Sequence, residues 1–190
     1  HSDMFDAPYL LAIDLEATCD ADQLPVAKRE IIEVGAVIVC GEYHRKLAEF
    51  QSFVRPIKTE SLTDYCMTLT SIRQSDVDSA PLFPVVLDAF LDFLKPFPNA
   101  RFCAWGDYDY GQFKRDCTTH EQSFPFVEQL DVSRSFRKMR KLGRRPSMRE
   151  AAASLAVEFE GTQHRAIDDA HCLAEILIRL MGDESARETR

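Results

Sequence analysis

The sequence predicts an α/β domain in which helices flank a mixed sheet of five strands. Short apolar runs of strand length come first in the chain, and segments with helical spacing then alternate with two further short runs. The length of 190 residues, with 45% hydrophobic and 28% charged residues, suits one globular domain with a substantial core and excludes a disordered chain. No internal repeat and no Ser/Gly-rich linker divides it.

The first three strands are expected near the N-terminus. Residues 9–13 form an apolar run that is too short for a helix, and residues 30–39 form a second apolar run. Residues 49–54 alternate between apolar and polar side chains, as in a half-buried strand. Because Gly41 and Glu42 supply a turn before this third strand, the three strands are expected to form a meander.

The rest of the chain is expected to alternate helices with two strands. Apolar residues recur at helical spacing over 76–94, where Pro81 and Pro84 favour the start of a helix. Ser147 and Glu150 have the spacing of a capping box, which opens a helix. The remaining expected elements are strands at 100–105 and 130–132, a helix at 110–116 and a last helix from about Asp168 to about Met181.

Both ends are expected to lie outside a single domain that spans residues 8–182. Residues 1–7 lack the basic and apolar regions of a secretory signal, and they are interpreted as a tag remnant or a flexible N-terminus. The polar tail, residues 183–190, is expected to fray. No apolar run approaches the roughly 20 residues needed to span a bilayer, so no membrane interaction is expected.

The six cysteines show no CxxC spacing, which leaves a zinc knuckle or a thioredoxin-type site without support. Cys40 and Cys103 follow apolar residues, which suits buried free thiols. A chain with such thiols is expected in the reducing cytoplasm.

Positive charge is concentrated in one segment of an acidic chain. The net charge of −8 argues against indiscriminate binding to nucleic acid. Residues 134–145, here called the basic segment, nevertheless contain no acidic residue. Its seven basic residues are Arg134, Arg137, Lys138, Arg140, Lys141, Arg144 and Arg145. The basic segment either forms a solvated helix face or binds phosphate groups.

Two pairs of acidic residues follow apolar runs. Asp14 and Glu16 end the first strand, and residues two apart in a strand share a face, so both carboxylates point the same way. Such a pair needs a cation between its charges if it is buried, and has no special meaning if the strand end is exposed. Asp107 and Asp109 lie at a strand-to-helix junction, where α/β sheets place ligands, although Asp is also common there as a helix cap.

A third acidic position, Asp169, falls in the first turn of the last helix. His164 lies five residues earlier, in the loop before that helix, and can lean over a site held by Asp169. A neutral imidazole suits a general base, although a structural role is the simpler interpretation of this His alone. Oxygen ligands with one His and no thiolate cluster favour Mg²⁺ or Mn²⁺, and two such ions commonly assist attack on a phosphodiester.

Three short motifs in this order resemble those of a known enzyme family. Residues 12–19 (AIDLEATC), 105–109 (WGDYD) and 164–170 (HRAIDDA) resemble the exonuclease motifs of the DEDDh 3′–5′ exonucleases, the DnaQ-like branch of the ribonuclease H-like fold. Residues 55–72 (RPIKTESLTDYCMTLTSI) are further similar to the Eri-type exonucleases, which trim the 3′ ends of small and structured RNAs. The resemblance covers about residues 8–181 and implies a ribonuclease H-like fold.

The resemblance implies a role for each motif residue. Asp14, Glu16 and Asp169 would hold the first of two divalent cations, Mg²⁺ or Mn²⁺. Asp14 and Asp109 would hold the second cation. His164 would take the proton from the attacking water, and the product would be a nucleoside 5′-monophosphate.

The resemblance also distinguishes neighbouring residues. It favours Asp109 over Asp107, because Asp109 is expected to precede a helix directly, and it favours Asp169 over Asp168. The His-to-Asp spacing of five implies the His subclass, since the tyrosine subclass needs Tyr where Arg165 stands.

Further residues are expected to contact the substrate. Leu15 is expected beside the terminal base, and the backbone around Ala17 and Thr18 beside the terminal sugar. Trp105 is a candidate for stacking on a base, although such a Trp more often belongs to the core. The basic segment is expected to bind the nucleic-acid backbone upstream of the 3′ end. Its expected contacts include Arg140 and Arg144.

The expected function is therefore metal-dependent 3′–5′ exonuclease activity on single-stranded RNA or on RNA 3′ overhangs. RNA is favoured over DNA as the substrate, and no obligate protein partner is inferred. One alternative is a DNA-directed or dual-specificity exonuclease with the same fold, because the sequence does not show how a 2′-hydroxyl would be recognised. The other is a module that binds nucleic acid without cleaving it, which the intact set of motif residues argues against.

Overall fold

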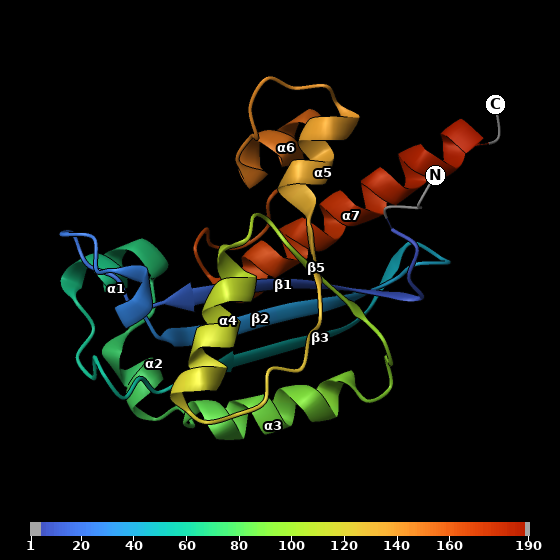
Figure 1. The fold of residues 1–190 in the computed structure, drawn as a ribbon. Coiled ribbons are helices and arrows are strands. Elements are labelled where there is room, and N and C mark those ends of the chain that lie inside the picture. Colours follow the sequence, from blue (N-terminus) through green and yellow to red (C-terminus); the bar gives the residue numbers. More distant parts are fainter. Residues whose placement is uncertain (1–4, 189–190) are drawn as a thin grey trace.

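The structure, a computed structural model that describes residues 5–188, confirms the predicted α/β class (Figure 1). Its sheet has five strands in the order β3-β2-β1-β4-β5. The strands are β1 (Tyr9–Ala17), β2 (Ile31–Cys40), β3 (Arg45–Phe53), β4 (Arg101–Ala104) and β5 (Gln129–Asp131). The first three form the predicted meander, with antiparallel pairing between β1 and β2 and between β2 and β3. Strands β4 and β5 add on in parallel, so the sheet is mixed as expected.

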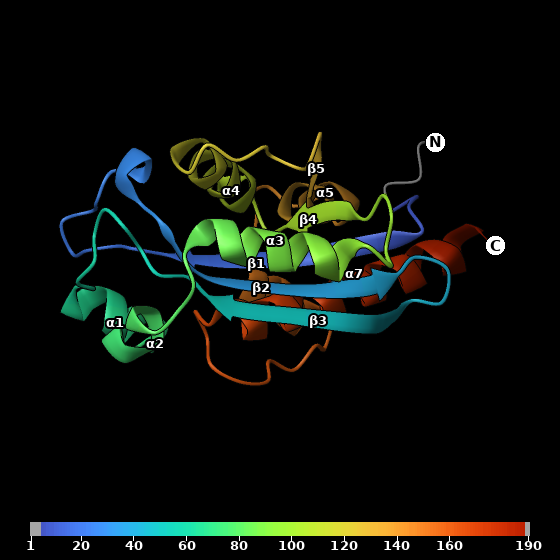
Figure 2. The same cartoon turned by 90° about the horizontal axis from the view of Figure 1, so that it is seen from below.

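Helices cover both faces of the sheet (Figures 1 and 2). Successive residues of β1 point alternately to the two sides. One face packs against α5 (Val132–Met139), α6 (Met148–Ser154) and α7 (Ala166–Glu188), and Leu10 and Ala12 belong to this core. The other face packs against α3 (Phe83–Leu94) and α4 (Tyr108–Thr119), where Leu11 and Ile13 are buried. A smaller cluster lies under α1 (Asp64–Thr70) and α2 (Gln74–Asp78).

Several predicted elements have different bounds in the structure. The helical pattern over 76–94 divides into α2 and α3, because the chain between them contains Pro81 and the longer helix starts with Pro84 in its first turn. Helix α1 and the 3₁₀ helix η1 (Val26–Lys28) were not expected. Helix α5 includes the start of the basic segment, for which a solvated helix face was one of the two interpretations. The capping box of Ser147 and Glu150 is present at the start of α6, as predicted.

The ends of the domain also differ from expectation. Phe5 is 6% exposed and belongs to the core cluster of α7, so ordered packing begins before residue 8. The last helix continues past Met181 to Glu188, so its predicted end is wrong. Residues 1–4, which the tag interpretation includes, lie outside the described residues.

Gly35 sets how closely α7 approaches the sheet. A Cβ at this position of β2 would lie 2.3 Å from the backbone carbon of Ala166 and from the backbone nitrogen of Ile167. Real Cβ atoms do not come so near to backbone, so only glycine allows the first turn of α7 to rest on β2. This contact places the loop before α7 beside the end of β1.

Two further expectations concern cysteines and membranes. All six cysteines are free, and Cys40 and Cys103 are buried as predicted. Across the described part of the chain, no helix combines the length and apolar character that crossing a membrane requires.

Candidate active site

Strand β1 supplies two carboxylates on the face that α7 covers. Asp14 and Glu16 continue the alternation of Leu10 and Ala12, so they point to the same side as these core residues. The Oδ2 atom of Asp14 is buried and has no hydrogen-bond partner within the described residues. Because a buried carboxylate oxygen without a partner is costly, this atom marks a place for a positively charged ligand.

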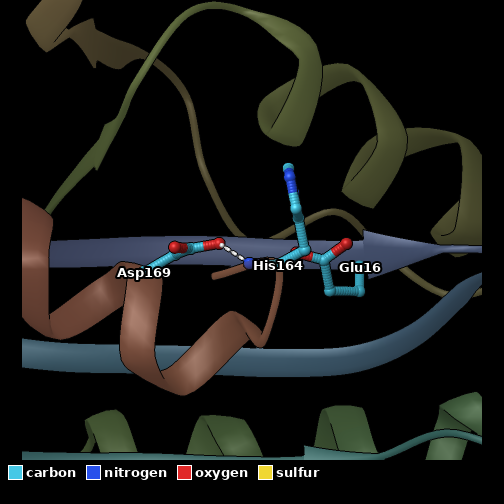
Figure 3. Close-up of side chains that lie close together, drawn as sticks. All are labelled: Glu16, His164 and Asp169. Carbon is cyan, nitrogen blue, oxygen red and sulfur yellow. Dashed lines mark hydrogen bonds between the residues drawn. The ribbon is translucent and has the colours of Figure 1, made fainter. Parts of the chain in front are cut away.

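The loop before α7 brings His164 and Asp169 to the same place (Figure 3). His164 has a φ of 62°, a left-handed backbone conformation that non-glycine residues adopt mainly where function or packing requires it. Its backbone N–H donates to Oδ2 of Asp169 over 3.1 Å. Glu16, His164 and Asp169 each offer one ligand atom, and these atoms lie within 4.8 Å of one another.

Helix α4 adds the fourth carboxylate, Asp109. This residue is 6% exposed, and its Oδ1 accepts a hydrogen bond of 3.0 Å from the backbone N–H of Leu15. Since Leu15 lies between Asp14 and Glu16, the bond fixes Asp109 beside the β1 pair. Asp109 sits within the first turn of α4 rather than before it, and the neighbouring Asp107 is exposed at the N-cap position.

Asp168 takes a different role from that of Asp169. Its carboxylate accepts a hydrogen bond of 2.8 Å from the backbone N–H of Thr162 and lies against Gly161. Asp168 therefore holds the loop that carries His164, whereas Asp169 faces Glu16 and His164.

Burial and mutual repulsion shift the titration of all four carboxyl groups. Burial raises the pKa of Asp14 well above its ordinary value, and the charges of Asp109, Glu16 and Asp169 raise it further. Burial, followed by the charge of Asp169, raises the pKa of Glu16 to about 9. The pKa of Asp109 and that of Asp169 both rise to about 7, mainly through burial. Four acids kept close together at such cost indicate a site for cations.

Glu33 is a further residue of this region that the sequence did not single out. It lies opposite Glu16 in the β1–β2 pairing and is fully buried. Its carboxylate accepts hydrogen bonds from the backbone N–H of Ala166 (2.6 Å) and from the guanidinium of Arg165 (3.2 and 3.3 Å). Glu33 therefore fastens the start of α7 to β2 and positions the loop that holds His164. In the sequence, the signal that could have pointed to Glu33 was an acidic residue within the apolar run of residues 30–39.

The residues expected around the terminal nucleotide lie near this site but are largely buried. The side chain of Leu15 is 5% exposed and packs in the core on the other side of β1, which argues against the predicted contact with a terminal base. Thr18 is 1% exposed, its backbone N–H donates to the Glu30 carbonyl, and its hydroxyl accepts from the Glu30 N–H. The carbonyl of Ala17 accepts a weak bond from the Cys66 thiol.

The other expected substrate contacts have partners within the chain. The indole N–H of Trp105 donates to the Pro146 carbonyl over 3.1 Å, and its ring packs near that of Phe136. This is the arrangement of a core residue. Arg140 pairs with Asp183 and Arg144 with Glu150, at 3.1 and 2.7 Å. Both arginines would have to share or exchange these partners to bind a phosphate.

The donor set fits hard divalent cations. Four carboxylates and an imidazole, with an unpartnered oxygen on Asp14, are the ligands that Mg²⁺ and Mn²⁺ accept, and no thiol belongs to the described group of ligand atoms. His164 has a pKa that burial lowers, which keeps its ring neutral near pH 7. A neutral imidazole beside a cation site can accept a proton from water.

The fold and this site define the class of protein. The sequence matches the RNase_T family, described as Exonuclease, over residues 11–177. The chain belongs to this family, and it is a DEDDh 3′–5′ exonuclease, a phosphodiester hydrolase. A solved structure of Pop2p of S. pombe, in a form with Mg²⁺ and Mn²⁺ bound, shares this fold with a TM-score of 0.64 at 13% identity.

Individual relatives match most of the chain. It is 30% identical to the 3′–5′ exonuclease Snipper of Drosophila melanogaster over 92% of this chain and 70% of that protein. It is 28% identical to 3′–5′ exoribonuclease 1 of Homo sapiens over 92% of this chain, and it spans about half (53%) of that longer protein. The solved nuclease domain of 3′hExo, a DEDDh family member bound to rAMP, superimposes with a TM-score of 0.88 at 27% identity and covers 94% of each chain.

Proposed function

We propose that this exonuclease degrades single-stranded RNA, or RNA 3′ overhangs, from the 3′ end and releases nucleoside 5′-monophosphates. The observation that carries the proposal is the set of Glu16, His164 and Asp169, whose ligand atoms lie within 4.8 Å of one another. Beside it lie Asp14, which has a buried oxygen without a partner among the described residues, and Asp109. The similarity to human 3′–5′ exoribonuclease 1, and to a nuclease domain solved with rAMP, supports RNA as the substrate class.

Two divalent cations, Mg²⁺ or Mn²⁺, are the proposed cofactors. Asp14, Glu16 and Asp169 would hold the first, and Asp14 together with Asp109 the second. When bound, such ions activate water and neutralise charge on a phosphodiester. They would also offset the burial and the mutual repulsion that raise the pKa of Asp14 and of Glu16.

His164 is the proposed general base. Its ring lies beside Glu16 and Asp169, and burial lowers its pKa, so at neutral pH the ring accepts a proton. The hydrogen bond from its backbone N–H to Asp169 and the hold of Asp168 on the preceding loop fix its position. These contacts hold the loop, and with it His164, in position before the substrate binds.

The upstream part of the RNA is proposed to lie along the basic segment. Four of its cations are exposed and have no ion pair within the described residues. They are Arg134, Arg137, Lys138 and Lys141. Such residues bind phosphates through charge and leave the base sequence unread.

The test uses 5′-labelled single-stranded RNA and DNA of one sequence, each incubated with Mg²⁺, Mn²⁺ or EDTA. The proposal expects a metal-dependent ladder that shortens from the 3′ end on RNA and is faint on DNA. Mass spectrometry of the products should show nucleoside 5′-monophosphates. The variant Asp14→Asn serves as the control for a contaminating nuclease. Equal ladders on both substrates would overturn the preference for RNA, and an intact substrate under every metal would overturn the proposed activity.

A further inference from the structure

Two cysteines meet where β1 ends, next to helix α1 (Figure 1). Cys19 follows the strand by two residues and is half-buried, whereas Cys66 lies on α1 and is fully buried. The two side chains share a hydrogen bond, and the Cys66 thiol donates to the Ala17 carbonyl over 3.8 Å. Cys19 also packs against the core cluster that contains Cys66. The two sulfur atoms are therefore neighbours, although both cysteines are free thiols.

Hydrogen bonds hold the backbones of both cysteines in place. The hydroxyl of Thr63, the N-cap of α1, accepts from the Cys66 N–H over 3.0 Å and donates to the Cys19 carbonyl over 2.6 Å. One side chain therefore bridges the two backbones. The neighbouring segments are tied as well, because the Glu30 carboxylate accepts from the backbone N–H groups of residues 57–59. The fold thus keeps the two thiols at close range.

Hydrolysis with divalent cations gives this pair of thiols no role. Such ions prefer oxygen ligands, and no thiol belongs to the group of ligand atoms found among the described residues. Redox-sensing cysteines, in contrast, are accessible to solvent and lie beside a second cysteine that resolves the oxidised sulfur. Cys19 offers the accessible sulfur of such a pair, and Cys66 is its buried neighbour.

We propose that Cys19 and Cys66 form a reversible disulfide in response to hydrogen peroxide, and that this disulfide lowers exonuclease activity. The thiolate of one cysteine attacks an oxygen of the peroxide, so that an S–O bond forms, the O–O bond breaks and hydroxide leaves. The second thiolate attacks the oxidised sulfur, so that the S–S bond forms and the S–O bond breaks with loss of a second hydroxide. The protons of the two thiols convert both hydroxides to water, and the two electrons that the thiols lose reduce the peroxide.

The disulfide acts on the site through the end of β1. An S–S bond measures about 2.05 Å, which is far shorter than a hydrogen bond between the same atoms, so at least one sulfur must move. The Cys66 thiol also loses the hydrogen that it donates to the Ala17 carbonyl. Ala17 directly follows Glu16, and the pairing of β1 with β2 changes register between these two residues, so the strand can shift there. This effect on activity rests on the proposed role of Glu16 as a cation ligand.

The experiment treats the reduced protein with hydrogen peroxide in EDTA, removes the peroxide with catalase, and then adds Mg²⁺ and 5′-labelled RNA. Mass spectrometry of unreduced tryptic peptides detects the disulfide independently of activity. The variants are Cys19→Ser and Cys66→Ala, and the first tests the inference even if the second fails to fold, because Cys19 is only half-buried. The matched control is Cys40→Ala, because Cys40 is a buried cysteine that pairs with Tyr9 at the opposite end of β1.

In the wild type and in Cys40→Ala, we expect a peptide pair that links Cys19 to Cys66. The rate should fall by about 10- to 100-fold, because a misplacement of about 1 Å can cost about 100-fold, and dithiothreitol should restore it. After peroxide, Cys19→Ser and Cys66→Ala should each keep the rate of their reduced forms. The inference would be overturned by the absence of the linked pair, by a linked pair that leaves the rate unchanged, or by an equal loss in Cys19→Ser. If DNA alone were degraded, the proposed RNA preference would fail, and rates on DNA would still decide the effect of the disulfide.

Discussion

At the scale of single residues, the buried carboxyl groups around the unpartnered oxygen of Asp14 allow a prediction of how the stability of the metal-free protein depends on pH. Burial raises the pKa of Asp109 and of Asp169 to about 7 and that of Glu16 to about 9, so the folded protein holds protons that the unfolded chain releases near pH 4. Stability of the metal-free protein therefore falls as pH rises from about 4 to about 9, and divalent cations should restore it at the high end.

The measurement is thermal unfolding with EDTA or with Mg²⁺ at pH 5.5 and pH 8.5. A cation at 100 times its Kd adds about 2.7 kcal/mol, or about 5–10 °C, and we expect most of this shift at pH 8.5. In Asp14→Asn the shift should shrink, the metal-free protein should be more stable at pH 8.5 than the wild type, and activity should be abolished. An unchanged metal shift in the variant would contradict the assignment of Asp14 as a ligand.

A second prediction concerns His164, whose replacement should remove activity without changing the stability of the fold. Asn tolerates the left-handed backbone of this position better than most residues, so His164→Asn should fold with an unchanged Tm. It should lose activity by about 10²- to 10⁴-fold, the usual contribution of a general base. Because burial and then Arg149 lower the pKa of His164, wild-type activity should fall with decreasing pH only below about 6.5, and this limb should vanish in the variant. A variant with half the wild-type rate would assign the proton transfer elsewhere.

The residue scale also shows what local sequence can predict. Asp14 and Glu16 could be placed on one face because alternation in a strand depends on neighbours alone. Glu33 escaped attention because its partners, Arg165 and Ala166, are more than a hundred residues away in the chain. A buried acid in an apolar strand acquires its role only when the helix that it holds is in place.

At the scale of elements, the contact between β2 and the first turn of α7 carries a third prediction. Gly35→Ala would put a Cβ 2.3 Å from the backbone of Ala166, and neither backbone can give way without moving the loop of His164. Overpacking of this kind costs about 1–3 kcal/mol, and we expect at least a tenfold loss of activity because ligands and base would separate.

The matched control for this variant lies on the same helix. A Cβ at Gly182 would have no neighbour within 4 Å, so Gly182→Ala should leave activity unchanged and add up to about 1 kcal/mol of stability. Urea unfolding and initial rates measure both variants. Full activity in Gly35→Ala would show that the close approach of α7 does not set the geometry of the site.

Elements were predictable where their signals are local. The capping box of α6 and the meander were correct because a cap and a turn are decided within a few residues. The bounds of helix α5 were not predicted because only two of its buried residues, Val132 and Phe136, are apolar. Its start also depends on Asp131, whose carboxylate accepts from the distant Gly106. The pattern over 76–94 wrongly predicted one helix, because Val77 belongs to α2 and is buried in a separate cluster.

At the scale of the whole molecule, the sequence was enough to predict the positive charge of the basic segment. It was not enough to predict which acidic residues form ion pairs with that segment. Arg140 pairs with Asp183 on α7, and Arg145 pairs with Asp131. These partners lie on elements that only the folded chain brings close. The structure therefore moves the proposed RNA-binding charge from Arg140 and Arg144 toward the exposed cations without partners in the described chain.

The last prediction concerns how these cations respond to salt. The variant Arg137→Gln, Lys138→Gln, Lys141→Gln removes three charges that have no intramolecular partner among the described residues. Each phosphate contact on single-stranded nucleic acid contributes about 0.7 to the slope of log affinity against log salt, so the slope for an RNA 20-mer should fall by about 2. Equal charge removal at Arg45, Arg73 and Lys95, which lie outside the segment, should leave the slope nearly unchanged. If both triple variants lowered the slope equally, net charge rather than the basic segment would govern binding. Only a local contact surface on the basic segment would make the two variants differ.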